Sequence, residues 1–251
     1  ELEAMDAMSL KCAQELSDAH VDVMGYACLV AIMSMGRGYH CVSEVNLHQE
    51  TIANDFPTPI VTSAGALING LKVLGAKKIS IITPYMRPLT DMVVDYIEHQ
   101  GFEVVDSIAL EIPDNLEVAA QNPLNLLEIY KRLDLTDVDV LVASACVQMP
   151  SLEAIDLIQA ECGIPVTSAA VCTTYEMMKK LGIDAKSAIG GELLNGKYLL
   201  SFWFADGIIG ALLELENILT FDITDMVKYE KPVEPDFIGP VVPVVSWNYY
   251  D

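Results

Sequence analysis

The sequence predicts an α/β fold in which two similar lobes, each a parallel sheet flanked by helices, enclose a cleft. An apolar run that ends on a cysteine occurs at residues 21–28 and again at residues 138–146. A Thr-Ser-Ala sequence follows each run, at residues 62–64 and 167–169, and leads into an amphipathic segment that ends in Leu-Gly. Matched elements in the same order indicate an internal repeat, and therefore two pseudo-symmetric lobes.

The first lobe is expected over residues 1–75. Its opening segment has apolar residues at steps of three or four from Leu2 to Leu16, which is typical of a helix with one buried face. Gly75 is an expected helix stop. The expected elements are a helix over residues 1–17, a strand over 21–28, an apolar run over 29–35, a helix over 43–54, a strand over 60–62 and a helix over 64–74.

The second lobe is expected over residues 76–185. Three of its strands lead into loops that carry Tyr85, Asn115 and Cys146. In open α/β sheets ligands bind at the carboxyl ends of the strands, so these residues are candidates for a site. The expected strands cover residues 77–83, 103–109, 138–145 and 165–167, and the expected helices cover residues 89–100, 124–133, 150–162 and 169–180.

The last segment, residues 186–251, matches neither half of the repeat, and its packing is left open. From Tyr198 onward it holds nine acidic residues against two lysines. Its most apolar run, residues 199–213, is interrupted by Ser201 and Asp206 and is shorter than the roughly 18 residues of a membrane span. We therefore expect this run to belong to a core.

Charge and cysteine content restrict the class of protein. The 251 residues carry a formal net charge of -22, so nucleic acid and anionic membranes are poor partners, because phosphate binding needs clustered Lys and Arg. The six cysteines include no Cys-x-x-Cys pair, and the chain is too long to need disulfides, which predicts free thiols in a reducing cytoplasm. The acidic Glu1-Leu2-Glu3 start does not resemble a signal peptide.

The two cysteines that end the repeated runs, Cys28 and Cys146, are the strongest candidates for chemistry. A thiol between a strand and a helix N-terminus lies in a positive field that lowers its pKa, and we expect this at both positions. Free cysteines are also common core residues, which is the alternative for any single one. Two cysteines at matched positions favour a functional role.

For other polar residues the sequence allows both a functional and a structural interpretation. Arg37, between two glycines, can bind a carboxylate or be a surface residue, and Tyr85 can donate to an oxyanion or pack at a strand end. Asn115 can be a turn residue. The pairs Thr62-Ser63 and Thr167-Ser168 precede helices and are expected to cap them rather than to act in catalysis. The remaining cysteines are assigned to structure, and the four histidines show no spacing of metal ligands.

Four short motifs occur at the expected strand ends: Gly-Tyr-Ala-Cys-Leu-Val at residues 25–30, Ile-Thr-Pro-Tyr at 82–85, Pro-Asp-Asn at 113–115 and Ala-Ser-Ala-Cys-Val-Gln at 143–148. Together they resemble the maleate cis-trans isomerase family of the aspartate/glutamate racemase superfamily, to which arylmalonate decarboxylase is also related. The resemblance extends from residue 1 to about residue 197.

This resemblance implies cofactor-independent isomerisation of maleate to fumarate, without metal. Cys28 matches the nucleophile that forms a succinyl thioether with the substrate, and Cys146 matches the thiol that acts on the neighbouring carbon. Tyr85 and Asn115 match residues that hydrogen-bond the substrate carboxylates. We also expect a homo-oligomer and a role in nicotinate degradation. No nucleic acid or membrane partner is expected.

The sequence departs from this family at both ends. The family begins with a strand and a Pro-Ser-Ser-Asn loop whose asparagine binds a carboxylate, and nothing before Glu1 supplies them. Residues 238–243, followed by Ser246 and Asn248, look similar to this opening. A circularly permuted or rebuilt chain is therefore a hypothesis, with residues 238–242 beside the Cys28 strand and Asn248 in place of the asparagine.

Two other functions stay open at this stage. A two-cysteine aspartate or glutamate racemase would use the same pair of thiols to move a proton at a carbon that bears an amine. A protein that binds dicarboxylates without turnover would use the same cleft for recognition alone.

Overall fold

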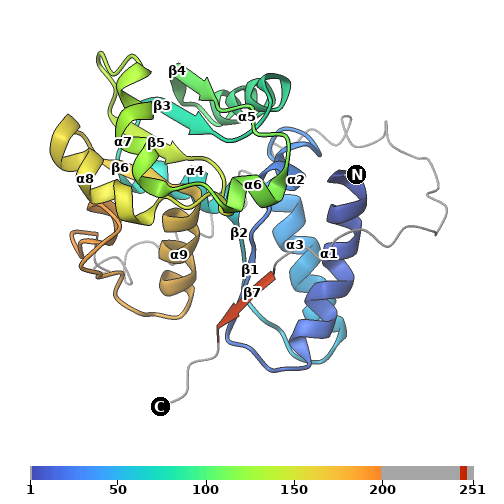
Figure 1. Ribbon diagram of the computed structural model, residues 1–251. Coiled ribbons are helices and arrows are strands. Elements are labelled where there is room, and N and C mark those ends of the chain that lie inside the picture. The colour runs from blue at the N-terminus through green and yellow to red at the C-terminus, as the bar shows by residue number, and fades with distance from the viewer. Residues whose placement is uncertain (1, 199–243, 248–251) are drawn as a thin grey trace. The chain divides into compact units, whose positions relative to one another are not determined.

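The computed structural model describes residues 2–198 and 244–247 of the chain (Figure 1). Within these ranges the strands form a three-stranded sheet, of order β2-β1-β7, and a four-stranded sheet, of order β4-β3-β5-β6. The strands are β1 (Val23–Tyr26), β2 (Ile60–Thr62), β3 (Lys78–Thr83), β4 (Glu103–Ala109), β5 (Val140–Ser144), β6 (Val166–Ser168) and β7 (Val244–Trp247).

Helices flank both sheets. They are α1 (Leu2–Ser17), α2 (Leu29–Met33), α3 (Tyr39–Ala53), α4 (Ser63–Val73), α5 (Arg87–His99), α6 (Asn115–Ala119), α7 (Leu126–Ile129), α8 (Leu152–Cys162) and α9 (Ala169–Lys180), with 3-10 turns η1 (Pro123–Asn125), η2 (Tyr130–Arg132) and η3 (Glu192–Leu194). None of the helices in the described ranges is long and apolar enough to cross a membrane.

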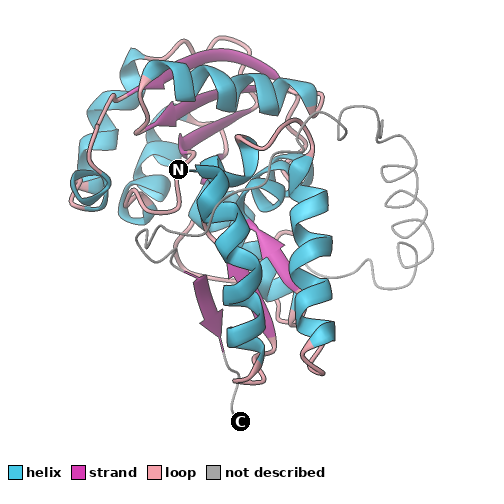
Figure 2. Ribbon diagram, turned by 90° about the vertical axis from the view of Figure 1, so that its right-hand side faces the viewer, coloured by secondary structure: helices cyan, strands magenta, loops and turns pink. Residues whose placement is uncertain are grey.

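The smaller sheet belongs to the first lobe. β1 is parallel to β2, with Met24 opposite Ile60, and antiparallel to β7, with Gly25 opposite Val245. The long helices α1 and α3 lie against each other over this sheet (Figures 1 and 2). A late segment therefore does pair beside β1, but it is β7; residues 238–242 and Asn248, which the hypothesis named, lie outside the described residues.

The larger sheet belongs to the second lobe and is parallel throughout. Its β5–β6 pair, with Leu141 opposite Val166, repeats the parallel β1–β2 pair of the first lobe. The helices that follow the repeated Thr-Ser-Ala sequence, α4 and α9, pack against each other. The internal repeat is thus visible in the strand pairing and in the helix packing.

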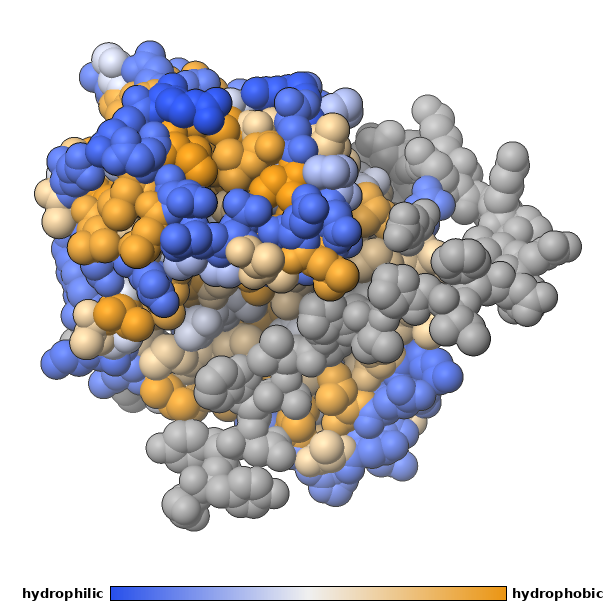
Figure 3. All heavy atoms as spheres, in the orientation of Figure 1, coloured by the Kyte–Doolittle hydropathy of each residue, from blue (hydrophilic) through white to orange (hydrophobic). Residues whose placement is uncertain are grey.

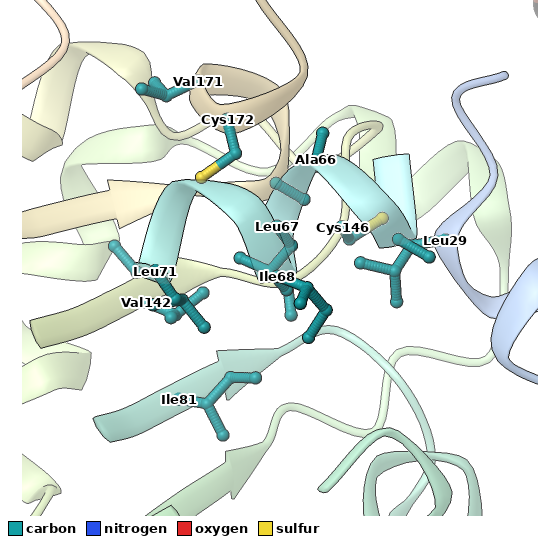
Figure 4. Packing of buried hydrophobic residues seen from close by; sticks show 14 of the residues in the cluster. Leu29, Ala66, Leu67, Ile68, Leu71, Ile81, Val142, Cys146, Val171 and Cys172 are labelled. Carbon is teal, nitrogen blue, oxygen red and sulfur yellow. The ribbon is translucent and has the colours of Figure 1, made fainter. Parts of the chain in front are cut away.

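A close contact between α4 and α9 joins the lobes. A Cβ atom built at Gly70 would lie 2.5 Å from the Cys172 Sγ, so only glycine fits at this crossing. Cys172 is fully buried among the apolar residues of both lobes (Figure 4). Its thiol lies 3.2 Å from the Thr167 hydroxyl, and burial raises its pKa to about 12, in agreement with a structural role.

Several local predictions were wrong in detail. The helix expected over residues 43–54 begins at Tyr39. The helix expected over residues 124–133 is split into η1, α7 and η2. The helix expected from Pro150 begins at Leu152. Helix α6 was not expected at all, because it is only one turn long and depends on Asp114, whose carboxylate accepts a hydrogen bond from the Leu116 N–H at 2.7 Å.

The surface of the described residues is mixed. Polar side chains alternate with apolar ones, and apolar side chains gather over α7 and α8 (Figure 3). The large exposed apolar residues of η1 and α8 are Leu124, Leu152 and Leu157.

Candidate active site

Cys28 lies where the first lobe's central strand ends. It is the N-cap of α2, a helix of five buried residues, and its own side chain is partly buried. An apolar strand followed at once by an apolar helix places the thiol at the rim of the core. Two residues upstream, Tyr26 ends β1 and is 2 % exposed.

The pKa of the Cys28 thiol is raised, which contradicts the expected lowering. Burial is the largest cause, and the nearby Cys146 and Asp6 add to it. The Ala31 N–H, in the first turn of α2, acts in the expected direction but is outweighed. The expected net lowering was therefore wrong, because desolvation outweighs this one N–H.

Cys146 follows β5, the matching strand of the second lobe, and is 7 % exposed. The Ser144 hydroxyl fixes its backbone, since it accepts from the Cys146 N–H at 3.2 Å and donates to the Cys146 carbonyl at 2.9 Å. The next helix, α8, begins only at Leu152. The predicted position at a helix N-terminus was thus wrong for Cys146, and a loop separates the thiol from the helix.

Tyr85 lies near both cysteines. Its hydroxyl donates a hydrogen bond to the Ala145 carbonyl at 3.1 Å, directly before Cys146. Burial raises its pKa well above the usual value, and the charge and hydrogen bond of Cys146 and the charge of Cys28 raise it further. Cys28, Tyr85 and Cys146 therefore lie within electrostatic range of one another, although they come from both lobes.

Asn115 is less closely tied to this group. It starts α6 and is exposed, and its carbonyl accepts a hydrogen bond at 2.8 Å from the side chain of Gln148, two residues after Cys146. The loop of Asn115 is thus fastened to the loop of Cys146. Asn248 lies outside the described residues.

The other candidates have structural partners. Arg37 does bind a carboxylate, but it is that of Asp95, at 2.5 and 3.0 Å. The Thr62 and Ser168 side chains cap α4 and α9, as predicted. All six cysteines are free thiols. Residues 2–198 and 244–247 contain no group of three or more His, Cys, Asp or Glu side chains arranged to hold a metal ion.

Sequence reasoning missed a polar cluster behind Cys28. The Tyr39 hydroxyl donates to the Asp6 Oδ2 at 2.6 Å, and burial raises the pKa of Asp6 despite this bond. The Asp6 Oδ1 and the Tyr26 hydroxyl are both buried without a hydrogen-bond partner in the described structure. Asp6 contacts Tyr39 across 33 residues of sequence, which no local pattern indicates.

A pocket adjoins this cluster rather than the two cysteines. Its walls come from α1, α3 and the first-lobe sheet, and Tyr26 contributes to them. The lining residues are Ser9, Ala13, Met24, Gly25, Tyr26, Leu47 and Ile60. Because the walls are mostly apolar, the pocket does not offer the donors that a dicarboxylate would need.

Comparison with known proteins identifies the family. The sequence model of the arylmalonate decarboxylase family matches residues 5–194. A maleate isomerase of Geobacillus stearothermophilus is 54% identical over 198 residues, which cover 79% of each chain.

The chain belongs to the maleate isomerase family. The structure of the maleate isomerase Iso from Pseudomonas putida S16, a cysteine-to-alanine variant with maleate, has a TM-score of 0.77 to this chain at 57% identity. That match covers 78% of this chain and 79% of the other.

A second maleate isomerase structure concerns the reaction itself. It is a cysteine-to-serine variant from Nocardia farcinica with a covalently bound succinylcysteine intermediate. The two sequences are 40% identical, and the match has a TM-score of 0.74. It covers 77% of this chain and 79% of the Nocardia farcinica chain. Arylmalonate decarboxylase shares the α/β fold, with a TM-score of 0.64 at 17% identity.

Proposed function

We propose that this protein catalyses the cis-trans isomerisation of maleate to fumarate through a covalent cysteine–succinyl intermediate. The observation that carries the proposal is the placement of Cys28 and Cys146 after the matched strands β1 and β5, with the Tyr85 hydroxyl bonded to the Ala145 carbonyl directly before Cys146. Family membership supports it, since maleate and a succinylcysteine are bound in the two related structures.

Cys28 is proposed as the nucleophile. Its thiolate adds to C2 of maleate, and the π electrons move to C3, where the adjacent carboxylate delocalises them. Cys146 gives its proton to C3, which leaves a succinyl thioether with a C2–C3 single bond. Thiolates suit this step because they are good nucleophiles and good leaving groups.

Rotation about C2–C3, which is now a single bond, places the two carboxylates on opposite sides. Cys146 then removes the proton from C3, and the Cys28–C2 bond breaks to return the thiolate and release fumarate. Counted from the Cys28 thiolate, which forms when the thiol loses its proton to solvent, every proton and electron pair returns to its origin, so the cycle requires no metal or redox cofactor.

The hydrogen-bonding residues are proposed to hold the substrate carboxylates. Tyr85 lies beside Cys146, and when substrate binds its hydroxyl is proposed to leave the Ala145 carbonyl and donate to the charge that develops on the carboxylate next to C3. Asn115 is held near the same loop through Gln148, and Asn248 is proposed from its sequence motif. These roles need no basic side chain, so a chain with a net charge of -22 can still bind a dicarboxylate through neutral donors.

The test is to incubate the protein with maleate and follow maleate and fumarate by NMR. Fumarate formation that is absent in Cys28→Ala is the expected result. Loss of optical rotation in L-aspartate or L-glutamate, with no fumarate, would indicate a racemase instead. Thermal stabilisation by maleate without fumarate would indicate a binding protein, because any ligand of the folded state raises its stability.

We also propose a homo-oligomer in the cytoplasm. Exposed apolar side chains on η1 and α8, including Leu124, Leu152 and Leu157, support the oligomer, and the six free thiols support a reducing compartment. A role in nicotinate degradation is an expectation from the sequence resemblance alone.

A further inference from the structure

The nucleophile helix has little stability of its own. Helix α2 has only five residues, all buried, and so short a helix depends on its surroundings. It packs against α1, α3, α4 and α5. The position of Cys28, at the N-cap of α2, is therefore set by contacts that other elements make.

The turn after α2 is fastened to the second lobe by a group of four residues, here called the clasp: Arg37, His40, Asp95 and Tyr96. The Arg37 guanidinium binds the Asp95 carboxylate of α5 through two nitrogens, at 2.5 and 3.0 Å. Both side chains are more than half exposed, so this pair adds little stability.

The buried half of the clasp is the pair of His40 and Tyr96. The Tyr96 hydroxyl, on α5, accepts a hydrogen bond from the His40 main-chain N–H at 3.1 Å and lies 2.5 Å from the His40 Nδ1. The phenol and the imidazole therefore share a buried hydrogen bond in addition to the main-chain one. Burial and the nearby Lys72 lower the pKa of His40 to about 4, so its imidazole is neutral at pH 7.

Helix α3 extends these contacts around α2. The Tyr39 hydroxyl donates to Asp6 of α1 at 2.6 Å. One turn later the Glu44 carboxylate accepts from the Thr62 N–H at 3.1 Å and the Thr62 hydroxyl at 2.8 Å, at the start of α4. The beginning of α3 is therefore bonded to three of the helices that pack against α2.

The same helix α5 that carries Tyr96 begins directly after Tyr85. The Thr90 hydroxyl of its first turns lies 2.6 Å from the Thr83 hydroxyl and contacts the Tyr85 carbonyl at 3.4 Å. One rigid helix thus connects the phenol beside Cys146 with the residue that holds the turn after α2.

We propose that Tyr96, through His40, is a positioning residue that fixes Cys28 of the first lobe relative to Tyr85 and Cys146 of the second. The inference rests on the proposed function, in which two thiols must reach adjacent carbons of one small substrate. In such reactions a displacement of about 1 Å can cost roughly 10²-fold in rate, even from a distant mutation. Tyr96 does not contact the reacting atoms.

The first experiment compares Tyr96→Phe with the matched control Tyr130→Phe. Tyr130 is also buried, but it lies in η2 and is not part of the clasp. We expect Tyr96→Phe to lower kcat at least tenfold, with KM within twofold of wild type, at a temperature well below both melting points. Tyr130→Phe should keep the wild-type kcat.

The second readout does not depend on maleate turnover. The reagent 1,3-dibromoacetone joins two thiols when each thiolate displaces one bromide, and intact mass with peptide mapping gives the ratio of Cys28–Cys146 cross-link to single alkylation. We expect Tyr96→Phe to lower this ratio at least threefold, and Tyr130→Phe to leave it unchanged.

Wild-type kcat or a wild-type cross-link ratio in folded Tyr96→Phe would overturn the inference and leave Tyr96 as a stabilising core residue. If wild type forms no fumarate, the proposed function fails, while the cross-link ratio still tests the clasp. Should Tyr96→Phe not fold, His40→Gln, which changes the other partner of the buried bond, is the substitute. It should lower kcat and the cross-link ratio at least threefold each, and wild-type values for either would overturn the inference.

Discussion

The pKa of the Cys28 thiol is raised although Cys28 lies at the start of a helix. Burial, the Cys146 thiol and the Asp6 carboxyl all disfavour the thiolate, and only the Ala31 N–H favours it. At neutral pH the thiol form is therefore favoured before substrate arrives. The rate of alkylation of Cys28 should therefore rise at a higher pH than that of an exposed cysteine.

The first prediction concerns that pH dependence. A thiol with a raised pKa forms thiolate only at higher pH, so the rate of Cys28 alkylation by iodoacetamide should still be rising above about pH 9. A cysteine peptide in free solution should level off earlier. The measurement is mass-spectrometric peptide mapping between pH 7 and pH 10, and a Cys28 profile that levels off below that of the peptide would contradict the raised pKa.

The second prediction concerns Tyr85. Tyr85→Phe removes a donor next to the developing negative charge, so kcat should fall by about 10²- to 10³-fold, with a smaller change in KM. Tyr130→Phe, a hydroxyl deletion elsewhere in the second lobe, is the control. Steady-state kinetics of fumarate formation give both constants, and equal effects of the two substitutions would exclude a specific role for Tyr85.

At the scale of elements, the beginning of α3 decides how the helices around α2 are joined. His40 is buried and neutral, with a pKa lowered to about 4 by burial and by the nearby Lys72. Its usual value of about 6.5 applies in the unfolded chain. Between these two values the unfolded state binds more protons, so stability falls as the pH is lowered.

The third prediction follows from this sign. On going from pH 7 to pH 5, wild type should lose on the order of 2 kcal/mol of unfolding free energy more than His40→Gln does. Asp6 and Glu44 act in the opposite direction because burial raises their pKa values, but they are present in both proteins. Urea unfolding at both pH values tests this, and identical pH dependence in the two proteins would rule out a neutral buried His40.

Elements with a strong local signal could be predicted, and those that depend on distant partners could not. Strands β2 and β4 begin and end where proline, glycine and apolar runs indicate. By contrast, His40 and Tyr96 are 56 residues apart in sequence, so their bond has no local signature. The raised pKa of Cys28 was missed for the same reason, since burial is a property of the folded chain.

At the scale of the whole molecule, the repeat explains why the proposed site draws on both lobes. Each half supplies a parallel strand pair, and a cysteine follows the first strand of each pair. Helices α4 and α9 pack together where the two halves meet. The repeat could be read from sequence because both copies keep their order. A late strand beside β1 was a hypothesis from the sequence; the described one is β7, and residues 238–242 lie outside the described residues.

The fourth prediction concerns assembly. If the apolar surface over η1 and α8 joins copies of the chain, Leu157→Glu should weaken the oligomer, because burying an unpaired carboxylate is costly. Gln49→Glu, which adds the same single negative charge at an exposed position of α3 without removing an apolar side chain, is the control. Light scattering across a concentration series measures the molar mass, and an unchanged mass in Leu157→Glu would remove this surface from the interface.

The claim that matters most is that one sulfur forms a bond with the substrate while the other acts on the neighbouring carbon. The most direct test is the intact mass of Cys146→Ser after incubation with maleate, followed by peptide mapping. We predict a mass increase equal to one maleic acid, located on Cys28 and absent in Cys28→Ala. No adduct in Cys146→Ser while wild type forms fumarate, or an adduct located on another cysteine, would contradict the assignment.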